Sequence, residues 1–169
     1  GAKLRFILPI LLVGIVLCSG CGIYSASSGR VDDTIKLVSI PYLVNETAEP
    51  SIGIELTDAI IMAIQADNTL KIVDDAISSS EISGRVVRYK LKEAFTTSDL
   101  KVDEYQVQIL VELSMRVKGD DSYLFENKKI AGTGNYILDD PDGTSEQTAK
   151  VEAAEEIVRE ILATIVEDW

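Results

Sequence analysis

Five basic residues stand at alternate positions in two segments of this sequence, and their spacing favours a binding surface. They are Arg88, Lys90, Lys92, Arg116 and Lys118. Side chains of a β-strand alternate between its two faces, so burial of Val87, Tyr89 and Leu91 would leave the basic residues together on the open face. Such a row binds anions, for example a phosphorylated glycolipid or an acidic wall of a partner protein. The alternative interpretation is an ordinary solvated face.

No recognisable set of catalytic residues stands in this sequence. The sequence contains no His, which removes the commonest general base and the commonest metal ligand. Gly132-Thr133-Gly134 lacks the context of a phosphate-binding loop and predicts a strand onto which something packs closely. The acidic segment 139–143 has the wrong ligand spacing for a calcium loop. We therefore expect a protein that is not an enzyme, with no catalytic residues, no metal site and no cofactor.

The segment 103–118 is expected to organise the fold. Its odd positions from Tyr105 to Val117 are apolar, and its even positions are polar except for Leu110. This alternation predicts a long strand with one dry and one wet face. A sheet with a single dry face belongs to a two-layer domain, in which helices cover that face. The wet face is then open to solvent or to a partner.

The flanking segments complete one domain. Amphipathic patterns predict helices at 51–66 and 144–167. A short strand is predicted at 70–73, and longer strands at 34–44, 82–93, 103–118 and 123–138, the last with a bulge at 127–129. We predict an α+β fold, a two-layer sandwich in which two helices pack on one face of a mixed or antiparallel sheet of about four strands.

The N-terminal segment resembles a secretory signal peptide. Lys3 and Arg5 precede an apolar run at 6–17, which is too short for the roughly 20 residues that cross a bilayer. The next residues, LCSGCG, resemble the lipobox of bacterial lipoproteins, so Cys21 is the predicted lipidation site. The alternatives are a permanent membrane anchor and a redox or metal pair of Cys18 with Cys21. The expected divisions are a signal peptide at 1–20, a lipidated N-terminus and tether at 21–33, and a single α+β domain at 34–169.

The sequence is strongly acidic. It has 16 basic against 28 acidic residues, for a formal charge of −12. Removal of residues 1–20 would leave 14 basic residues and a charge of −14. A nucleic-acid binder needs a basic surface, so we expect no nucleic-acid partner. The row of basic residues is a local exception to this balance.

Several segments together resemble one protein family. They are IKLVSIPYLVNETAEPSIGIELTDAIIMAI at 35–64, ISGRVVRYK at 82–90, the strand entry Glu104-Tyr105-Gln106, and the start Cys21-Gly22-x-Tyr24. This pattern is similar to that of LptE, the lipopolysaccharide-assembly lipoprotein family. The resemblance implies a non-enzymatic lipoprotein with two helices packed on a four-stranded sheet. Gly22 after the cysteine also resembles a sorting signal for the outer membrane.

The same resemblance implies a function and partners. It implies a lipid-anchored protein on the periplasmic side of the outer membrane that plugs, and helps to assemble, the β-barrel translocon delivering lipopolysaccharide to the cell surface. The partner would be an LptD-like barrel, bound one to one, with lipopolysaccharide as a second candidate ligand. The family's lipopolysaccharide contacts are basic residues near sheet loops, which adds Lys101 to the five basic candidates for ligand or partner binding.

A second resemblance supports an alternative hypothesis. Ile40-Pro41 followed by Asn45-Glu46-Thr47 is similar to the first strand and loop of lipoproteins that serve secretion channels or activate peptidoglycan synthases. Such a protein would bind a soluble or ring-forming partner in place of a barrel. The two hypotheses differ in the partner that a pull-down of the native lipoprotein would recover.

Overall fold

The computed structural model describes residues 31–96 and 102–167. Its elements are the strands β1 (Leu37–Ser39), β2 (Val44–Asn45), β3 (Lys71–Ile72), β4 (Ser80–Thr96), β5 (Val102–Val117) and β6 (Ser122–Ile137), the helices α2 (Ile52–Asp67) and α3 (Glu146–Glu167), and the 3-10 turn η1 (Asp75–Ile77). The three long strands form an antiparallel meander, β4-β5-β6. β1 and β2 pair in parallel with the outer edge of β4, and β3 pairs in parallel with β1.

The predicted α+β class and mixed sheet are confirmed, whereas the predicted count of about four strands is wrong, since the described sheet has six. Part of the difference lies at 34–44, where one strand was expected. Pro41 has no N–H to donate to a sheet ladder, and the N–H of Leu43 donates to Thr57 Oγ1 of α2 at 2.9 Å. The chain between β1 and β2 is therefore bound to a helix and not to a neighbouring strand.

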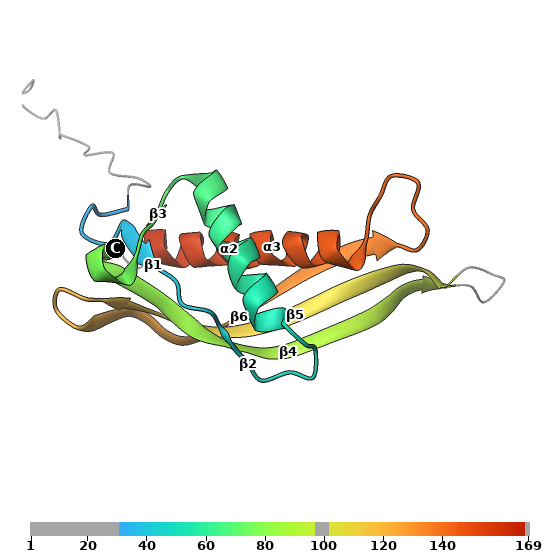
Figure 1. Cartoon of the computed structure of the whole chain (residues 1–169), viewed down its shortest axis with the longest axis horizontal. Helices are drawn as coiled ribbons and strands as arrows, with labels where there is room; N and C mark the ends of the chain where they lie inside the picture. Colours follow the sequence, from blue (N-terminus) through green and yellow to red (C-terminus); the bar gives the residue numbers. More distant parts are fainter. Residues whose placement is uncertain (1–30, 97–101, 168–169) are drawn as a thin grey trace, which may run out of the picture.

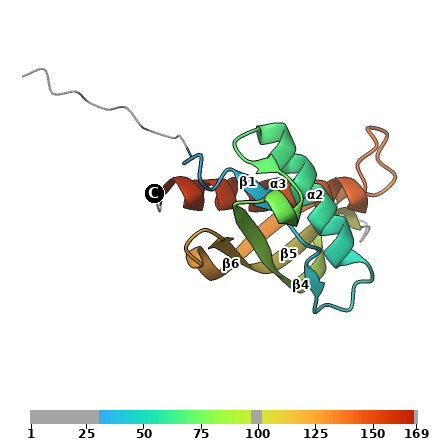
Figure 2. The ribbon, with the colours of Figure 1, turned by 60° about the vertical axis from the view of Figure 1, so that its left-hand side comes forward.

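The dry face of β5 lies where the alternation predicted it. Val107, Ile109, Val111, Leu113 and Met115 are at most 1% exposed. Both helices lie on this side of the sheet (Figure 1). α3 packs on β6 and β5, whereas α2 packs chiefly on α3 (Figure 2) and also contacts β3. The two-layer prediction is thus correct. Both helices lie on the same side of the sheet (Figure 1), and α2 makes most of its contacts with α3.

A β-bulge at Val87 changes which residues of β4 face the core. Val86 lies opposite Val111 and is fully buried, while the next paired residue, Arg88, lies opposite Leu110. Even-numbered residues face the core before the bulge and odd-numbered residues face it afterwards. The expectation that Val87 is buried is therefore wrong, because it is the extra residue in the register.

Leu91 was also expected in the core, and this expectation is wrong. Its side chain lies on the core side of β4 but is 43% exposed. The far ends of β4 and β5 extend past the helices (Figure 1), and the described chain covers Leu91 only in part. The predicted bulge in β6 is confirmed, since Asn127 has a positive φ of 50° and the register with β5 shifts beside it.

Two glycines let α3 lie directly on the backbone of β6. A Cβ atom on Gly132 would stand 2.2 Å from the carbonyl oxygen of Ala153, and one on Gly134 would stand 2.0 Å from that of Ala149. Both distances are far inside van der Waals contact, so no side chain fits at either position. The expected close packing at this glycine pair is confirmed, and its partner is the small-residue face of α3.

α3 also closes the outer edge of β6. The N–H groups of Thr133 and Asn135 donate to the carboxylates of Glu156 and Glu152, at 2.7 and 3.0 Å. The N–H of Ile137 donates to Thr144 Oγ1 at 3.1 Å. These amides point away from β5 and would otherwise be open to another strand. Side chains of α3 and its preceding loop satisfy them.

The backbone contact predicts the effect of filling it. Gly134→Val would force α3 away from β6 and is expected to lower the free energy of unfolding by about 3 kcal/mol. Ala131→Val is the matched control, because Ala131 is exposed on the same strand and valine suits a strand. Thermal or urea unfolding measures both variants. Equal stabilities of the two variants would show that α3 does not rest on the backbone of β6.

Candidate partner-binding surface

The five residues of the predicted basic row separate into two groups, the first of which lies in the C-terminal half of β4. Arg88, Lys90 and Lys92 are exposed on the face turned away from the helices. Their partners across the ladder, Leu110, Gln108 and Gln106, are uncharged. Among the side chains that the structure describes, none forms an ion pair with these three cations. Their charge is available to a ligand.

Neutral amides lie beside this group. Gln108 Nε2 donates to Gln106 Oε1 at 2.6 Å, and Gln106 Nε2 donates to Asn135 Oδ1 of β6 at 3.2 Å. The open face at this end therefore combines a row of cations at the edge with hydrogen-bonding groups in the middle of the sheet. An anionic or polar ligand could use both.

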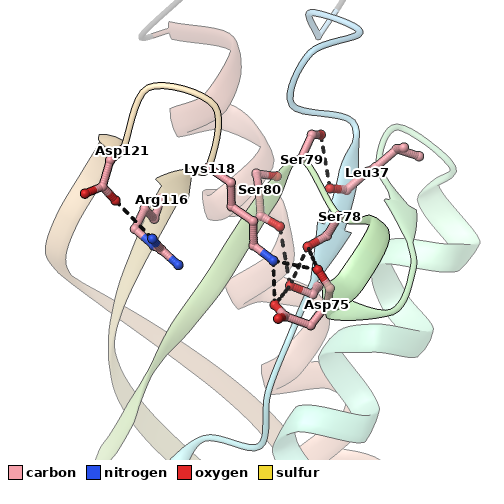
Figure 3. A network of polar contacts seen from close by, with 9 residues as sticks. Leu37, Asp75, Ser78, Ser79, Ser80, Arg116, Lys118 and Asp121 are labelled. Atoms are coloured by element: carbon pink, nitrogen blue, oxygen red, sulfur yellow. Dashed lines mark hydrogen bonds and ion pairs between the residues drawn. The ribbon is translucent and has the colours of Figure 1, made fainter.

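The second group, Arg116 and Lys118, is paired within the protein (Figure 3). Arg116 Nη1 lies 3.0 Å from Asp121 Oδ1 in the β5–β6 turn. Lys118 Nζ lies 2.5 Å from Asp75 Oδ1 and 2.7 Å from the carbonyl oxygen of Asp75 in η1. The hydrogen bond from Lys118, followed by that from Ser39, lowers the pKa of Asp75. The bond to Asp121 raises the pKa of Arg116. These two cations hold turns in place and offer less charge to a ligand.

Two further predicted site residues lie outside the described residues. They are Lys101, the candidate near the β4–β5 turn, and Cys21, the predicted lipidation site. Both stay predictions. The described binding candidates thus reduce to three unpaired cations at one end of the sheet and two paired cations at the other.

A buried lysine, which the sequence did not reveal, joins the helices to β4 near the first group. Lys150 of α3 is 9% exposed. Its Nζ lies 3.0 Å from Glu55 of α2 and 3.6 Å from both Glu49 and Glu146. It also lies 5.5 Å from the ring centre of Tyr89, whose hydroxyl donates to Glu146. One ammonium group therefore holds three carboxylates from three segments.

The electrostatics of this cluster favour the charged lysine. Burial alone lowers the pKa of Lys150, but the hydrogen bond to Glu55 and the charges of Glu146 and Glu49 outweigh it, so the pKa is raised. For Tyr89, burial and then the bond to Glu146 raise the pKa of the hydroxyl. Of these partners, Glu146 alone has a signal in the sequence, because it stands four residues before Lys150 on one helix. The other partners meet through tertiary packing.

Neither a cluster of metal ligands nor a helix able to span a membrane is found in the described part of the chain. Residues 31–96 and 102–167 contain no group of three or more His, Cys, Asp or Glu side chains placed to hold a metal ion. In the acidic segment 139–143, Asp140 accepts hydrogen bonds from the N–H groups of Asp142 and Thr144, which organises a turn. None of the described helices has the length and apolar character needed to cross a membrane.

A family model described as lipopolysaccharide-assembly, LptE, matches residues 35–168. The match spans the strands, both helices and the basic row. The chain belongs to the LptE family. The suspected resemblance is thereby confirmed, and LptE is a family of non-enzymatic lipopolysaccharide-assembly lipoproteins. Among curated proteins, none matches the sequence.

Several solved structures align with this LptE-family chain. A protein of Xanthomonas campestris aligns with a TM-score of 0.53 at 11% identity, covering 85% of this chain and 90% of that one. A putative lipoprotein of Caulobacter crescentus gives 0.49 at 13% identity, covering 79% and 88%. The PelC dodecamer of Paraburkholderia phytofirmans gives 0.47 at 16% identity, covering 78% and 92%. At 11% identity, the likeness to the Xanthomonas campestris protein shows a shared fold alone.

The Lys150 cluster predicts both a loss of stability and a pH effect. Lys150→Met leaves three carboxylates without their cation and is expected to cost about 2 kcal/mol, less than for fully buried pairs because the glutamates are partly exposed. A raised pKa means that the folded state holds its proton more tightly. The stability from Lys150 is therefore complete below about pH 10.5 and is lost as the pH rises further.

Denaturant unfolding across pH 7 to 11 measures this contribution. Arg159→Met is the control, since Arg159 is exposed on the same helix and pairs with no carboxylate among the described side chains. The wild type and the control should lose stability above about pH 10.5, and Lys150→Met should lose less. Identical pH profiles for Lys150→Met and the wild type would contradict the assignment.

Proposed function

We propose that this LptE-family chain is an outer-membrane lipoprotein, anchored through Cys21 and facing the periplasm. It plugs, and helps to assemble, the β-barrel translocon that delivers lipopolysaccharide to the outer leaflet. It binds an LptD-like barrel one to one. Family membership over residues 35–168 supports the assembly role. The observation that carries the contact is the row of Arg88, Lys90 and Lys92, which no described carboxylate pairs, on an otherwise acidic protein.

The position of the row supports a contact away from the anchor. β1 pairs with β4 at Ser80, near the point where the chain enters the domain, and Lys90 lies ten positions further along β4. At about 3.3 Å per residue, this places the row roughly 30 Å from that point. A rigid sheet carries the cations to an acidic wall of the barrel. Phosphate groups of lipopolysaccharide offer the same charge and are the second candidate ligand.

Charge reversal tests this contact. Lys90→Glu with Lys92→Glu is expected to leave thermal stability nearly unchanged, because both side chains are exposed and form no ion pair with a described residue. Co-purification with the barrel should fall and become more sensitive to salt, since each rim contact is worth about 0.2–1 kcal/mol and like charges repel. Lys71→Glu with Arg159→Glu is the matched control, with the same change in formal charge elsewhere on the surface.

The readouts separate the two ligands. Loss of barrel co-purification with lipopolysaccharide binding retained assigns the row to the barrel, and the opposite result assigns it to the lipid. If the charge reversal leaves both activities at the level of the control, the row is a solvated face. If a pull-down of the native lipoprotein recovers no barrel but a secretion-channel protein or a peptidoglycan synthase, the alternative function replaces the one proposed here.

Lipidation at Cys21 has a direct test. A thioether-linked diacylglycerol and an N-acyl chain supply the two or more lipid anchors that stable attachment requires. Mass spectrometry of the native protein should find an acylated N-terminal Cys21 with no residues before it. Cys21→Ala should abolish membrane attachment and leave the fold intact, as circular dichroism would measure. An unmodified peptide spanning Ser19 to Gly22 in the mature protein would refute the assignment.

A further inference from the structure

The two outer edges of the sheet of long strands, β6 and β4, differ in how far their outward backbone groups are hydrogen-bonded. Along β6, the outward N–H groups of Thr133, Asn135 and Ile137 are bound by α3 and its preceding loop. Along β4, β1 and β2 cover the edge only as far as Val86, whose carbonyl oxygen accepts the N–H of Glu46 at 3.0 Å. Beyond it lie residues 87–93, here called the free edge. Apart from the bulged Val87 they pair with β5, and no described strand pairs with them on the other side.

The ladder shows which groups of the free edge point outward. The N–H of Thr133 points away from β5. The N–H and C=O of its neighbour Gly132 therefore point toward β5 and exchange hydrogen bonds with Ile109. The backbone N–H and C=O of Ile109 therefore point toward β6 and away from β4. Tyr89, its partner on β4, then has its own N–H and C=O pointing outward, away from β5. The same alternation applies to Leu91. Among the described residues, none offers a backbone partner to the outward groups of Tyr89 and Leu91.

We propose that the free edge accepts an extended segment of a partner protein as an additional β-strand. Such a strand would hydrogen-bond to the outward groups of Tyr89 and Leu91. Its side chains would alternate between the two faces of the sheet, beside Lys90 and Lys92 on one face and beside the exposed Leu91 on the other. The segment that fits therefore alternates acidic with apolar residues.

Charge argues against a second copy of this chain as the occupant. Two free edges paired with each other would bring Arg88, Lys90 and Lys92 against the same residues of the other copy, and like charges facing across a ladder are destabilising. Lysines and a bulge on an edge strand are devices that prevent such self-pairing. The same three charges, unpaired among the described side chains, attract a strand that carries carboxylates.

The inference deepens the proposed function and rests on it for taking the partner to be the translocon barrel. The direct probe is a blocked synthetic peptide of about seven residues in which glutamate and valine alternate, titrated into the full-length lipoprotein in detergent. Two control peptides are a lysine–valine peptide and the glutamate–valine peptide with alternate backbone amides methylated. Binding and residue-level amide exchange are both measured by NMR.

The expected result has a signature that charge alone would not produce. In the free protein, the amides of Tyr89 and Leu91 should exchange fast and that of Lys90 slowly, because the last one is bonded to β5. The glutamate–valine peptide should slow exchange at Tyr89 and Leu91, and both control peptides should bind about tenfold or more weakly. Equal binding of the methylated peptide, unchanged exchange at the two amides, or no binding of the acidic peptide would each overturn strand addition.

A single substitution separates strand addition from the proposed function. Leu91→Pro removes an outward N–H while it keeps all three cations and the bonds to β5, and proline is tolerated on edge strands. Leu91→Ala keeps the N–H and is the control. Leu91→Pro should weaken peptide binding about tenfold and reduce barrel co-purification, relative to Leu91→Ala.

The outcomes for strand addition and for the proposed function are distinct. Strand addition is wrong, with the proposed function intact, if Leu91→Pro co-purifies with the barrel as well as Leu91→Ala does and the Lys90 and Lys92 reversal does not. If the wild-type lipoprotein recovers no barrel, the proposed function fails, and the peptide titration still decides whether the free edge binds a strand. If Leu91→Pro unfolds, the methylated peptide and the amide exchange of the wild type decide it.

Discussion

The structure depends on the direct contact between the backbones of α3 and β6. Gly132 and Gly134 leave no space for a side chain, so the helix lies closer to this strand than ordinary packing allows. At that distance the side chains along one flank of α3 reach past the strand. Glu152 and Glu156 therefore bind the outward amides of β6, and the edge is closed by the same helix that covers the face.

The position of α3 also determines where the rest of the domain is held. Lys150, one residue after Ala149 in the contact, points away from β6 toward α2 and binds Glu55, while Glu146 one turn earlier binds Tyr89 of β4. α3, which lies on β6, is thus joined to α2 by an ion pair and to β4, on the opposite side of the sheet, by a hydrogen bond. The two sheet edges differ because α3 supplies carboxylates to the outward amides of β6, whereas no helix of the described residues does so for the free edge of β4.

Much of the fold could be predicted from the sequence, because its strongest signals are periodic. The alternation in β5 identified the buried face, and the glycine pair identified the close approach. Val87 was misplaced because a bulge depends on the register between two strands, which no pattern within β4 records. For the site, the alternation placed Arg88, Lys90 and Lys92 on the open face. It could not show that Lys118 meets Asp75 or that Lys150 is buried against Glu55, since those contacts join segments distant in sequence. The pair of Arg116 with Asp121 is local, but it depends on the geometry of the β5–β6 turn, which the alternation does not record.

The unpaired cations are not explained by a shortage of carboxylates, since the chain has 28 acidic residues against 16 basic ones. Opposite Lys90 and Lys92 the sequence places Gln108 and Gln106, where two glutamates would have formed cross-strand ion pairs. Only a little further along the same two strands, Glu112 does pair with Arg85, at 2.7 Å. An exposed ion pair stabilises a fold by only about 0.2–1 kcal/mol, so its absence costs the domain little. A cation without an internal partner has no ion pair to break when an acidic group approaches. Leaving these lysines opposite neutral amides therefore sacrifices little stability and preserves their charge for another molecule.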